Sequence, residues 1–116
     1  FCCVDGIETR QFIYNIKKDE IYLWLDSRMS AETFEVYAAY DLDSHNFYSG
    51  TFFIAAEAYN GGCTAKSTIY CANIAAGFLV QQFSKFIRRM CLQHKVSMNL
   101  LSMEISVEWI KEIILN

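Results

Sequence analysis

The sequence predicts an α/β domain organised around a long buried helix, on three observations. Residues 1–4 form an apolar run that stops at Asp5 and leads through a turn into a helical pattern, as a β-strand followed by a helix does. A second apolar run is followed by the polar group 26–28. Residues 65–90 carry one helical pattern in which Gly77 is the only helix breaker.

One helix is predicted in the first half of the chain, over residues 8–17. Ile7, Phe12 and Ile16 share one side of it, and lysines lie near its C-terminal end, where the helix dipole favours positive charge. Three further segments predict β-strands, because they are dense in β-branched and aromatic residues or alternate with period 2. These segments are residues 20–25, 33–40 and 48–54, with a polar turn at residues 41–46.

The second half of the chain is dominated by the predicted helix over residues 65–90, with Thr64 as its N-cap. The first half of this helix is apolar nearly all round, which predicts burial on several sides. Residues 97–105 predict a final strand, and residues 107–115 predict a short helix or a strand.

Composition limits the classes of function. At 116 residues the chain has room for one domain. Its 53% hydrophobic and 16% aromatic residues exceed what such a domain needs, which predicts an apolar face covered in a homo- or heterodimer. The net charge of -3 argues against nucleic-acid binding. The longest apolar run, residues 69–80, is shorter than the ~20 residues that span a bilayer, so no membrane association is predicted.

The cysteines predict a reducing compartment. Their number is five, which is odd, and they lack the spacing of a disulfide framework. This pattern favours free thiols in a cytoplasmic protein. No Cys-x-x-Cys pair occurs, so no structural zinc site is predicted.

Two polar groups at the ends of predicted strands are candidate site residues, each with two interpretations. Asp5 stands where a carboxylate could hold Mg²⁺, or it caps the following helix. Asp26 and Arg28 end the next strand, where the planar guanidinium of Arg28 suits a phosphate or carboxylate. The alternative for these two residues is a surface turn with a local ion pair.

Cys63 is the third candidate. It follows two glycines and precedes the long helix, whose N-terminus would lower the pKa of a nearby thiol and activate it as a nucleophile. The alternative is a small apolar residue under a loop. His45 and His94 have no evident metal partners in the sequence, and both are predicted to be surface residues.

The segment Cys-Val-Asp-Gly-Ile-Glu-Thr-Arg at residues 3–10 resembles a motif of the ThiF/MoeB/HesA superfamily, written roughly as C-(T/V)-D-N-x-x-x-R. Asp5 matches the aspartate that binds the Mg²⁺ of ATP in that family, and Arg10 matches the motif's arginine. Gly6 stands in place of the family's asparagine.

Two shorter segments extend the resemblance. Residues 25–29, Leu-Asp-Ser-Arg-Met, resemble the "DGRM" stretch of some bacterial and phage ThiF-like proteins. Cys63 followed by Thr64 resembles the Cys-Thr of ubiquitin-activating enzymes, in which the cysteine takes the carrier protein as a thioester. The resemblance thus implies that Cys63 and Arg28 are catalytic, and that Asp26 joins Asp5 and Arg10 in binding the cofactor.

The resemblance implies a fold and an activity. Residues 1–116 would form a single partial domain, the C-terminal half of a Rossmann-like adenylating domain with a mixed sheet and a long buried helix. The activity would be adenylation of the C-terminal carboxylate of a ubiquitin-like or sulfur-carrier protein with ATP and Mg²⁺. The family's glycine-rich ATP loop lies upstream of this motif, so weak ATP binding and no activity are expected without the N-terminal half. The alternative is a non-enzymatic dimerisation or interaction module derived from the same fold.

Overall fold

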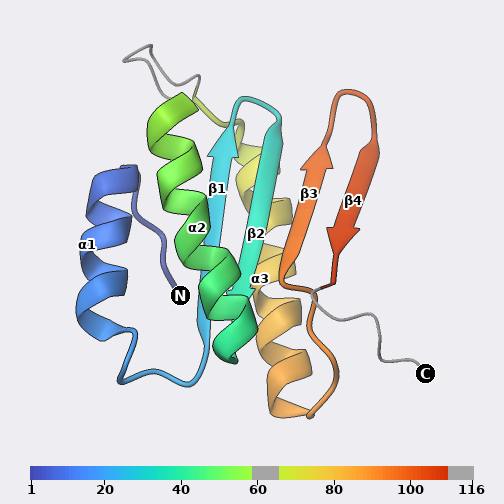
Figure 1. Cartoon of the computed structure of the whole chain (residues 1–116). Helices are drawn as coiled ribbons and strands as arrows, with labels where there is room; N and C mark the ends of the chain where they lie inside the picture. The colour runs from blue at the N-terminus through green and yellow to red at the C-terminus, as the bar shows by residue number, and fades with distance from the viewer. Residues whose placement is uncertain (59–65, 110–116) are drawn as a thin grey trace.

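The computed structural model of the chain describes residues 1–58 and 66–109 (Figure 1). Within these residues the chain forms an α/β fold of three helices and a four-stranded sheet, which confirms the predicted class. The elements in chain order are α1 (Ile7–Lys17), β1 (Trp24–Ser30), β2 (Thr33–Ala39), α2 (Leu42–Ala58), α3 (Ile69–Ile87), β3 (Lys95–Asn99) and β4 (Glu104–Glu108).

The sheet has the strand order β1-β2-β3-β4, and each pair of neighbours is antiparallel. A mixed sheet was expected. Among the described residues, parallel pairing is limited to one isolated bridge between Cys2 and Asp26, beside β1. The strand expected at residues 1–4 is therefore reduced to this bridge, in which the Cys2 amide donates to the carbonyl oxygen of Leu25 at 2.7 Å.

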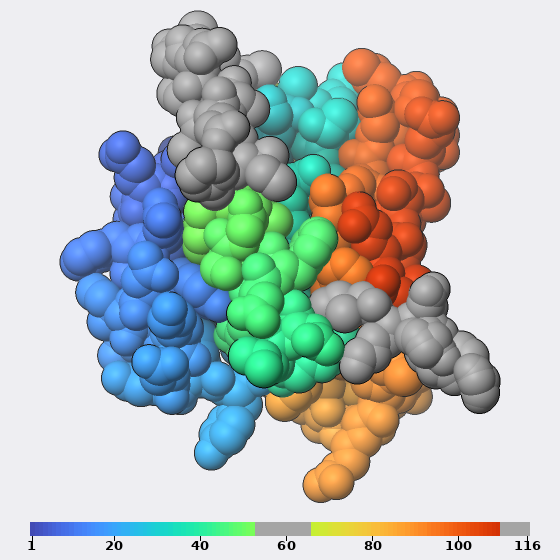
Figure 2. Space-filling view, viewed as in Figure 1, coloured from blue at the N-terminus to red at the C-terminus, as the bar shows by residue number. Residues whose placement is uncertain are grey.

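Helices cover both faces of the sheet, with α1 and α2 on one side and α3 on the other (Figure 1). The face that carries α1 and α2 is seen in Figure 2, where β3 and β4 lie to one side of α2. Each side has its own core. The core under α3 includes Leu25, Phe34, Val36, Ala75 and Leu79. The core under α1 and α2 includes Tyr14, Trp24, Tyr37, Tyr48 and Phe52.

Strand β1 is shifted toward the C-terminus relative to its prediction. It runs from Trp24 to Ser30 and not over residues 20–25, so Asp26 and Arg28 lie within the strand and do not follow it. Strand β2 confirms the prediction for residues 33–40. The single strand predicted over 97–105 is wrong, because a turn separates β3 from β4 and makes a hairpin.

Helix α2 replaces the turn and the strand predicted at residues 41–46 and 48–54. Ser44, Tyr48 and Phe52 are spaced by four and are all buried, as one face of a helix requires. Asp41 and Ser44 cap its start reciprocally: the Ser44 amide donates to Asp41 Oδ1 at 2.8 Å, and the Asp41 amide donates to Ser44 Oγ at 2.9 Å. The aromatic content favoured a strand locally, but packing against the sheet selects the helix.

Helix α3 begins at Ile69, later than the predicted start at residue 65. Thr68 is its N-cap, accepting a hydrogen bond from the Cys71 amide at 3.2 Å. The predicted Thr64 cap lies outside the described residues. The predicted burial on several sides is wrong, because Cys71, Ala75, Leu79 and Gln82 face the sheet while much of the opposite side is exposed.

Candidate functional site

A buried carboxylate, Asp26, organises the face of the sheet under α1 and α2. Its side chain is 0% exposed. Oδ1 accepts a hydrogen bond from Arg10 Nε at 2.8 Å, while Oδ2 accepts from Arg28 Nε at 3.2 Å and from the Tyr48 hydroxyl at 2.6 Å. Two guanidinium groups and a phenol thus compensate the cost of burying this charge.

Arg10, from α1, connects this carboxylate to the N-terminal segment. Its Nη2 donates to the carbonyl oxygen of Val4 at 2.5 Å and to that of Ser27 at 3.3 Å. The side chain is buried, and its fork of donors holds the backbone before Asp5 against β1. Arg10 therefore fixes where the chain enters α1.

Asp5 lies directly after that anchored segment and is exposed. The interpretation of Asp5 as a helix cap is wrong, because the N-cap of α1 is Gly6 and no side chain caps it. The amides of the first helical turn consequently lack a side-chain acceptor. Asp5 is thus an exposed residue that directly precedes the N-cap of α1.

Arg28 is enclosed by aromatic rings. Its guanidinium carbon lies 4.5 Å from the ring centroid of Tyr37, 5.4 Å from that of Tyr48 and 5.3 Å from that of Phe52, which is cation–π geometry. Nη2 donates to Thr51 Oγ1 at 2.8 Å. The alternative of a surface turn for residues 26–28 is wrong, since these residues lie within β1 and the ion pair is buried or nearly so.

Tyr48 belongs to this cluster and was not singled out from the sequence. Burial raises its pKa, and the charge of Asp26 and its hydrogen bond to Asp26 raise the pKa further, so the hydroxyl remains a donor. Burial also raises the pKa of Tyr37, with Glu35 adding to the effect. The signal that reveals Tyr48 is its spacing of four from Ser44 and Phe52.

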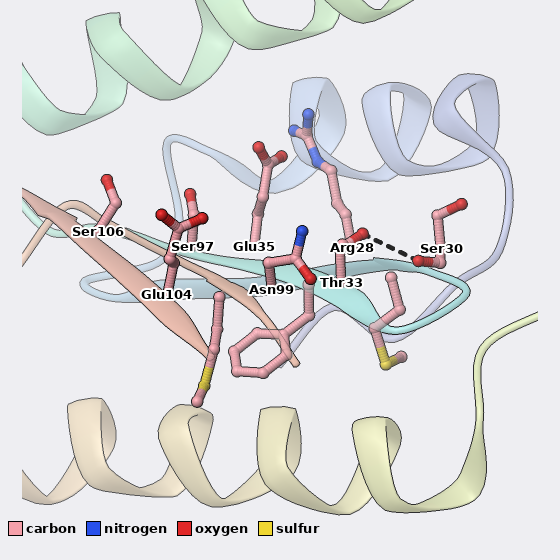
Figure 3. Close-up of a pocket in the computed structure, with 11 residues that line it drawn as sticks. Arg28, Ser30, Thr33, Glu35, Ser97, Asn99, Glu104 and Ser106 are labelled. Atoms are coloured by element: carbon pink, nitrogen blue, oxygen red, sulfur yellow. Dashed lines mark hydrogen bonds between the residues drawn. The ribbon is translucent and has the colours of Figure 1, made fainter. Parts of the chain in front are cut away.

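An open cavity of about 380 Å³ adjoins Arg28 (Figure 3). Cross-strand register places Arg28, Glu35, Ser97 and Ser106 in one row, and Figure 3 shows them pointing to the side of α1 and α2. The row is polar because this face of an antiparallel sheet meets solvent beyond α2. Arg28 thus links the buried Asp26 cluster to an accessible polar surface.

The two histidines differ from their prediction as surface residues. His45 is half-buried, and its Nδ1 hydrogen-bonds the Tyr14 hydroxyl at 2.7 Å. His94 is buried, with its ring 4.4 Å from that of Phe47 in an edge-to-face contact. Burial lowers the pKa of both imidazoles.

The structure brings four of the five predicted site residues into one region. Asp26, Arg10 and Arg28 touch one another through the buried cluster, and Asp5 follows the segment that Arg10 holds. Cys63 lies outside the described residues. Across residues 1–58 and 66–109, no group of three or more His, Cys, Asp or Glu side chains could hold a metal ion. None of the helices in this part of the chain is long and apolar enough to cross a membrane.

No family model matches the sequence, and no curated protein matches it either.

Proposed function

We propose that this chain contributes a metal–nucleotide carboxylate, Asp5, to a ThiF-like adenylyltransferase that activates the C-terminal carboxylate of a ubiquitin-like or sulfur-carrier protein. One observation carries the proposal. Asp5 is exposed and does not cap α1, although the carbonyl of Val4 just before it accepts a hydrogen bond from the buried Arg10 side chain. A pre-organised acidic group without a structural task suits ligand binding.

The donor set fits Mg²⁺ carried by a nucleotide. Mg²⁺ is usually held by one or two carboxylates, with phosphate oxygens and waters completing an octahedron, so one aspartate is sufficient on the protein side. The free amides of the first turn of α1 and the positive end of its dipole also favour nearby phosphate oxygens. When bound, Mg·ATP would supply the electrophilic phosphorus that a carrier carboxylate attacks.

Within this proposal, Arg10 and Asp26 would position Asp5 and would not contact the nucleotide. Arg10 donates from Nε to Asp26 and from Nη2 to the carbonyl oxygens of Val4 and Ser27. Few of its guanidinium donors therefore remain for a phosphate. Asp26 has no exposed surface from which to reach a ligand. Both residues would act on the nucleotide through the placement of Asp5.

Two catalytic assignments remain part of the proposal. Arg28 lines the cavity with 15% of its side chain exposed, and this exposed part of the guanidinium would contact bound substrate. Cys63 would take the activated carrier: its thiolate attacks the acyl-adenylate carbonyl, a C–S bond forms, and AMP leaves. This step assigns Cys63 the nucleophile's role that the Cys-Thr resemblance implies.

The sheet is compatible with the C-terminal part of a larger mixed sheet. Residues 1–4 run parallel to β1 at the free edge of the antiparallel sheet, through the Cys2–Asp26 bridge. This edge is compatible with parallel strands, because residues 1–4 already run in the same direction as β1.

Manganese–ATP tests the role of Asp5 directly, because Mn²⁺ occupies Mg²⁺ sites and broadens the NMR signals of nearby nuclei. Titrating the full chain with Mn·ATP is expected to broaden the amide signals of residues 5–9 first. Binding is expected in the millimolar range, since no phosphate loop assists it. The variant Asp5→Asn should abolish this selective broadening.

Glu8→Gln is the matched control, because Glu8 is an exposed carboxylate in the first turn of the same helix. It should leave the broadening near Asp5 unchanged. Equal broadening in wild type and Asp5→Asn, or broadening that centres on Glu35 and Glu104, would contradict the proposal.

A second candidate function is an interaction module without catalysis. The specific observation in its favour is the apolar outer side of α3. Ile69 is 79% exposed and Ile87 is 60% exposed. The two functions are compatible within one protein.

A further inference from the structure

The outer side of α3 carries a heptad seam. Its members alternate in spacing between four and three residues, which is the pattern of positions a and d in a coiled coil. They are Ile69, Asn73, Ala76, Val80, Phe83 and Ile87, and each of the six is exposed. The opposite side of the helix already packs on β1 and β2 through Cys71, Ala75 and Leu79.

This seam is more than scattered apolar surface. Single exposed apolar residues are common in folded proteins, whereas a row of apolar residues along a helix, here interrupted at Asn73, indicates a contact surface. Val80 is 59% exposed and Phe83 is 40% exposed, between the isoleucines at the two ends. Phe1 adds apolar surface beside the seam: its ring centroid lies 5.6 Å from that of Phe83, and the residue is 65% exposed.

We propose that a second copy of this chain covers the seam, with the two α3 helices antiparallel about a two-fold axis. In an antiparallel pair, a positions face d positions. Ile69 then lies opposite Ile87 of the partner subunit, Asn73 lies opposite Phe83 of the partner subunit, and Ala76 lies opposite Val80 of the partner subunit. The two-fold axis repeats each of these three residue pairs, so the same surface of both copies forms the contact and the seam is self-complementary.

Gly77 allows the two helices to approach each other closely at the centre of this pairing. The axis passes near residues 77 and 78, the midpoint of the seam. A Cβ added at Gly77 would meet nothing within 4 Å, so the glycine faces open space in the monomer. Ala76 and Gly77 together allow the two helix backbones to approach closely where the helices cross.

Charge selects the antiparallel direction. Arg88 and Arg89 follow the C-terminal end of α3, and a parallel pair would place the four guanidinium groups of two copies together. The N-terminal end has no such like-charged pair: Lys66 precedes the helix, and Glu32 accepts a hydrogen bond from the Tyr70 hydroxyl at 2.6 Å. Antiparallel pairing separates the arginines by about the 28 Å length of a 19-residue helix and aligns the dipoles favourably.

The size of the seam predicts a reversible dimer. A stable interface buries about 800 Å² on each partner, and one helix of this length with the Phe1 ring provides less than that. The dissociation constant is therefore expected at about 1–50 μM. The pairing uses no residue of the Asp5 site, so its test and the test of nucleotide binding fail independently.

Sedimentation equilibrium of the full chain, over about 1–200 μM, measures the dimer. Wild type is expected to shift from monomer to dimer across this range. Gly77→Leu should raise the dissociation constant at least about tenfold, because the new side chain occupies the crossing point, and its Cβ meets nothing within 4 Å in its own subunit.

Gly50→Leu is the matched control. Gly50 is also helical, and a Cβ there also meets nothing within 4 Å, but it lies on α2, on the other side of the sheet. It should dimerise as wild type does, with circular dichroism showing both variants folded. A wild type that stays monomeric at 200 μM, or a Gly77→Leu variant with an unchanged constant, overturns the proposal.

Orientation is tested with a spin label on Cys91, which is exposed and lies shortly after α3. In a Cys3→Ser, Cys63→Ser background, the antiparallel dimer should give a label–label distance above about 25 Å, as the helix length requires. A distance below about 15 Å would overturn the antiparallel arrangement.

Discussion

Arg10 and Asp26 form a buried ion pair: Nε donates to Oδ1 at 2.8 Å, and the two side chains are 5% and 0% exposed. The pair joins α1 to the middle of β1 and also holds the carbonyl of Val4. It is thus the connection between the rigid sheet and the segment that presents Asp5. Loss of the pair should lower the free energy of unfolding and make the backbone of residues 1–5 less ordered.

Arg10→Met should destabilise the protein by about 3 kcal/mol, the lower end of the range for breaking a buried pair, since Arg28 and Tyr48 still compensate Asp26. Urea unfolding measures this value. Lys17→Met is the control in the same helix: Lys17 pairs with Glu20 at 3.4 Å with both side chains more than half exposed, and its loss should cost below about 0.5 kcal/mol. Equal costs for the two variants would contradict the structural role of Arg10.

Leu79 and Val80 are consecutive residues of α3 that differ in burial: Leu79 is 6% exposed on the sheet-facing side, and Val80 is 59% exposed. Leu79→Ala should lower the free energy of unfolding by about 2–5 kcal/mol, through lost burial and the cavity left behind. Val80→Ala should change it by less than about 0.5 kcal/mol when measured at a concentration that keeps the chain monomeric. A larger cost at Val80 than at Leu79 would mean that the helix is rotated relative to the sheet.

His94 should make stability depend on pH. Burial lowers its pKa from 6.5, an effect that Glu108 partly opposes, so the unfolded chain takes up a proton first as the pH falls. The free energy of unfolding should therefore be constant with respect to this group above pH ~6.5 and decrease below it. His94→Gln should make the profile between about pH 5.5 and 7 flatter, with His45 responsible for the remaining slope. Identical profiles for wild type and variant would exclude this contribution.

The sequence predicted those elements in which the local residue pattern favours the same structure as packing in the folded protein does. Helix α1 follows from its 3.6-residue period, and β2 follows from its alternation. Helix α2 was missed because its aromatic and β-branched residues favour strands locally. What decides its structure is the row formed by Ser44, Tyr48 and Phe52, together with the cap at Asp41, and both depend on the sheet beneath.

The sequence singled out the candidate site residues without showing which of them are buried. Of the residues singled out, Arg10, Asp26 and Arg28 share one hydrogen-bonded cluster, whereas Asp5 only follows the Val4 carbonyl that Arg10 holds. The spacing of a motif does not indicate how deeply each side chain is buried, so it could not show that Asp26 is buried while Asp5 is exposed. That difference arises because β1 begins later than its apolar residues suggest, which moves Asp26 from the end of the strand to its interior.

The order of the strands has a consequence for how the chain folds. The hairpins β1–β2 and β3–β4 each join segments that are adjacent in sequence, so each forms by closing a short loop. Only β2–β3 pairing must bridge residues 40–94, and it carries the largest loop-closure entropy of the sheet. Because α3 packs on β1 and β2, the first hairpin has a partner that can cover it before β3 arrives. Sheet assembly therefore has a local stage and a single long-range stage, and the second of these sets the folding rate.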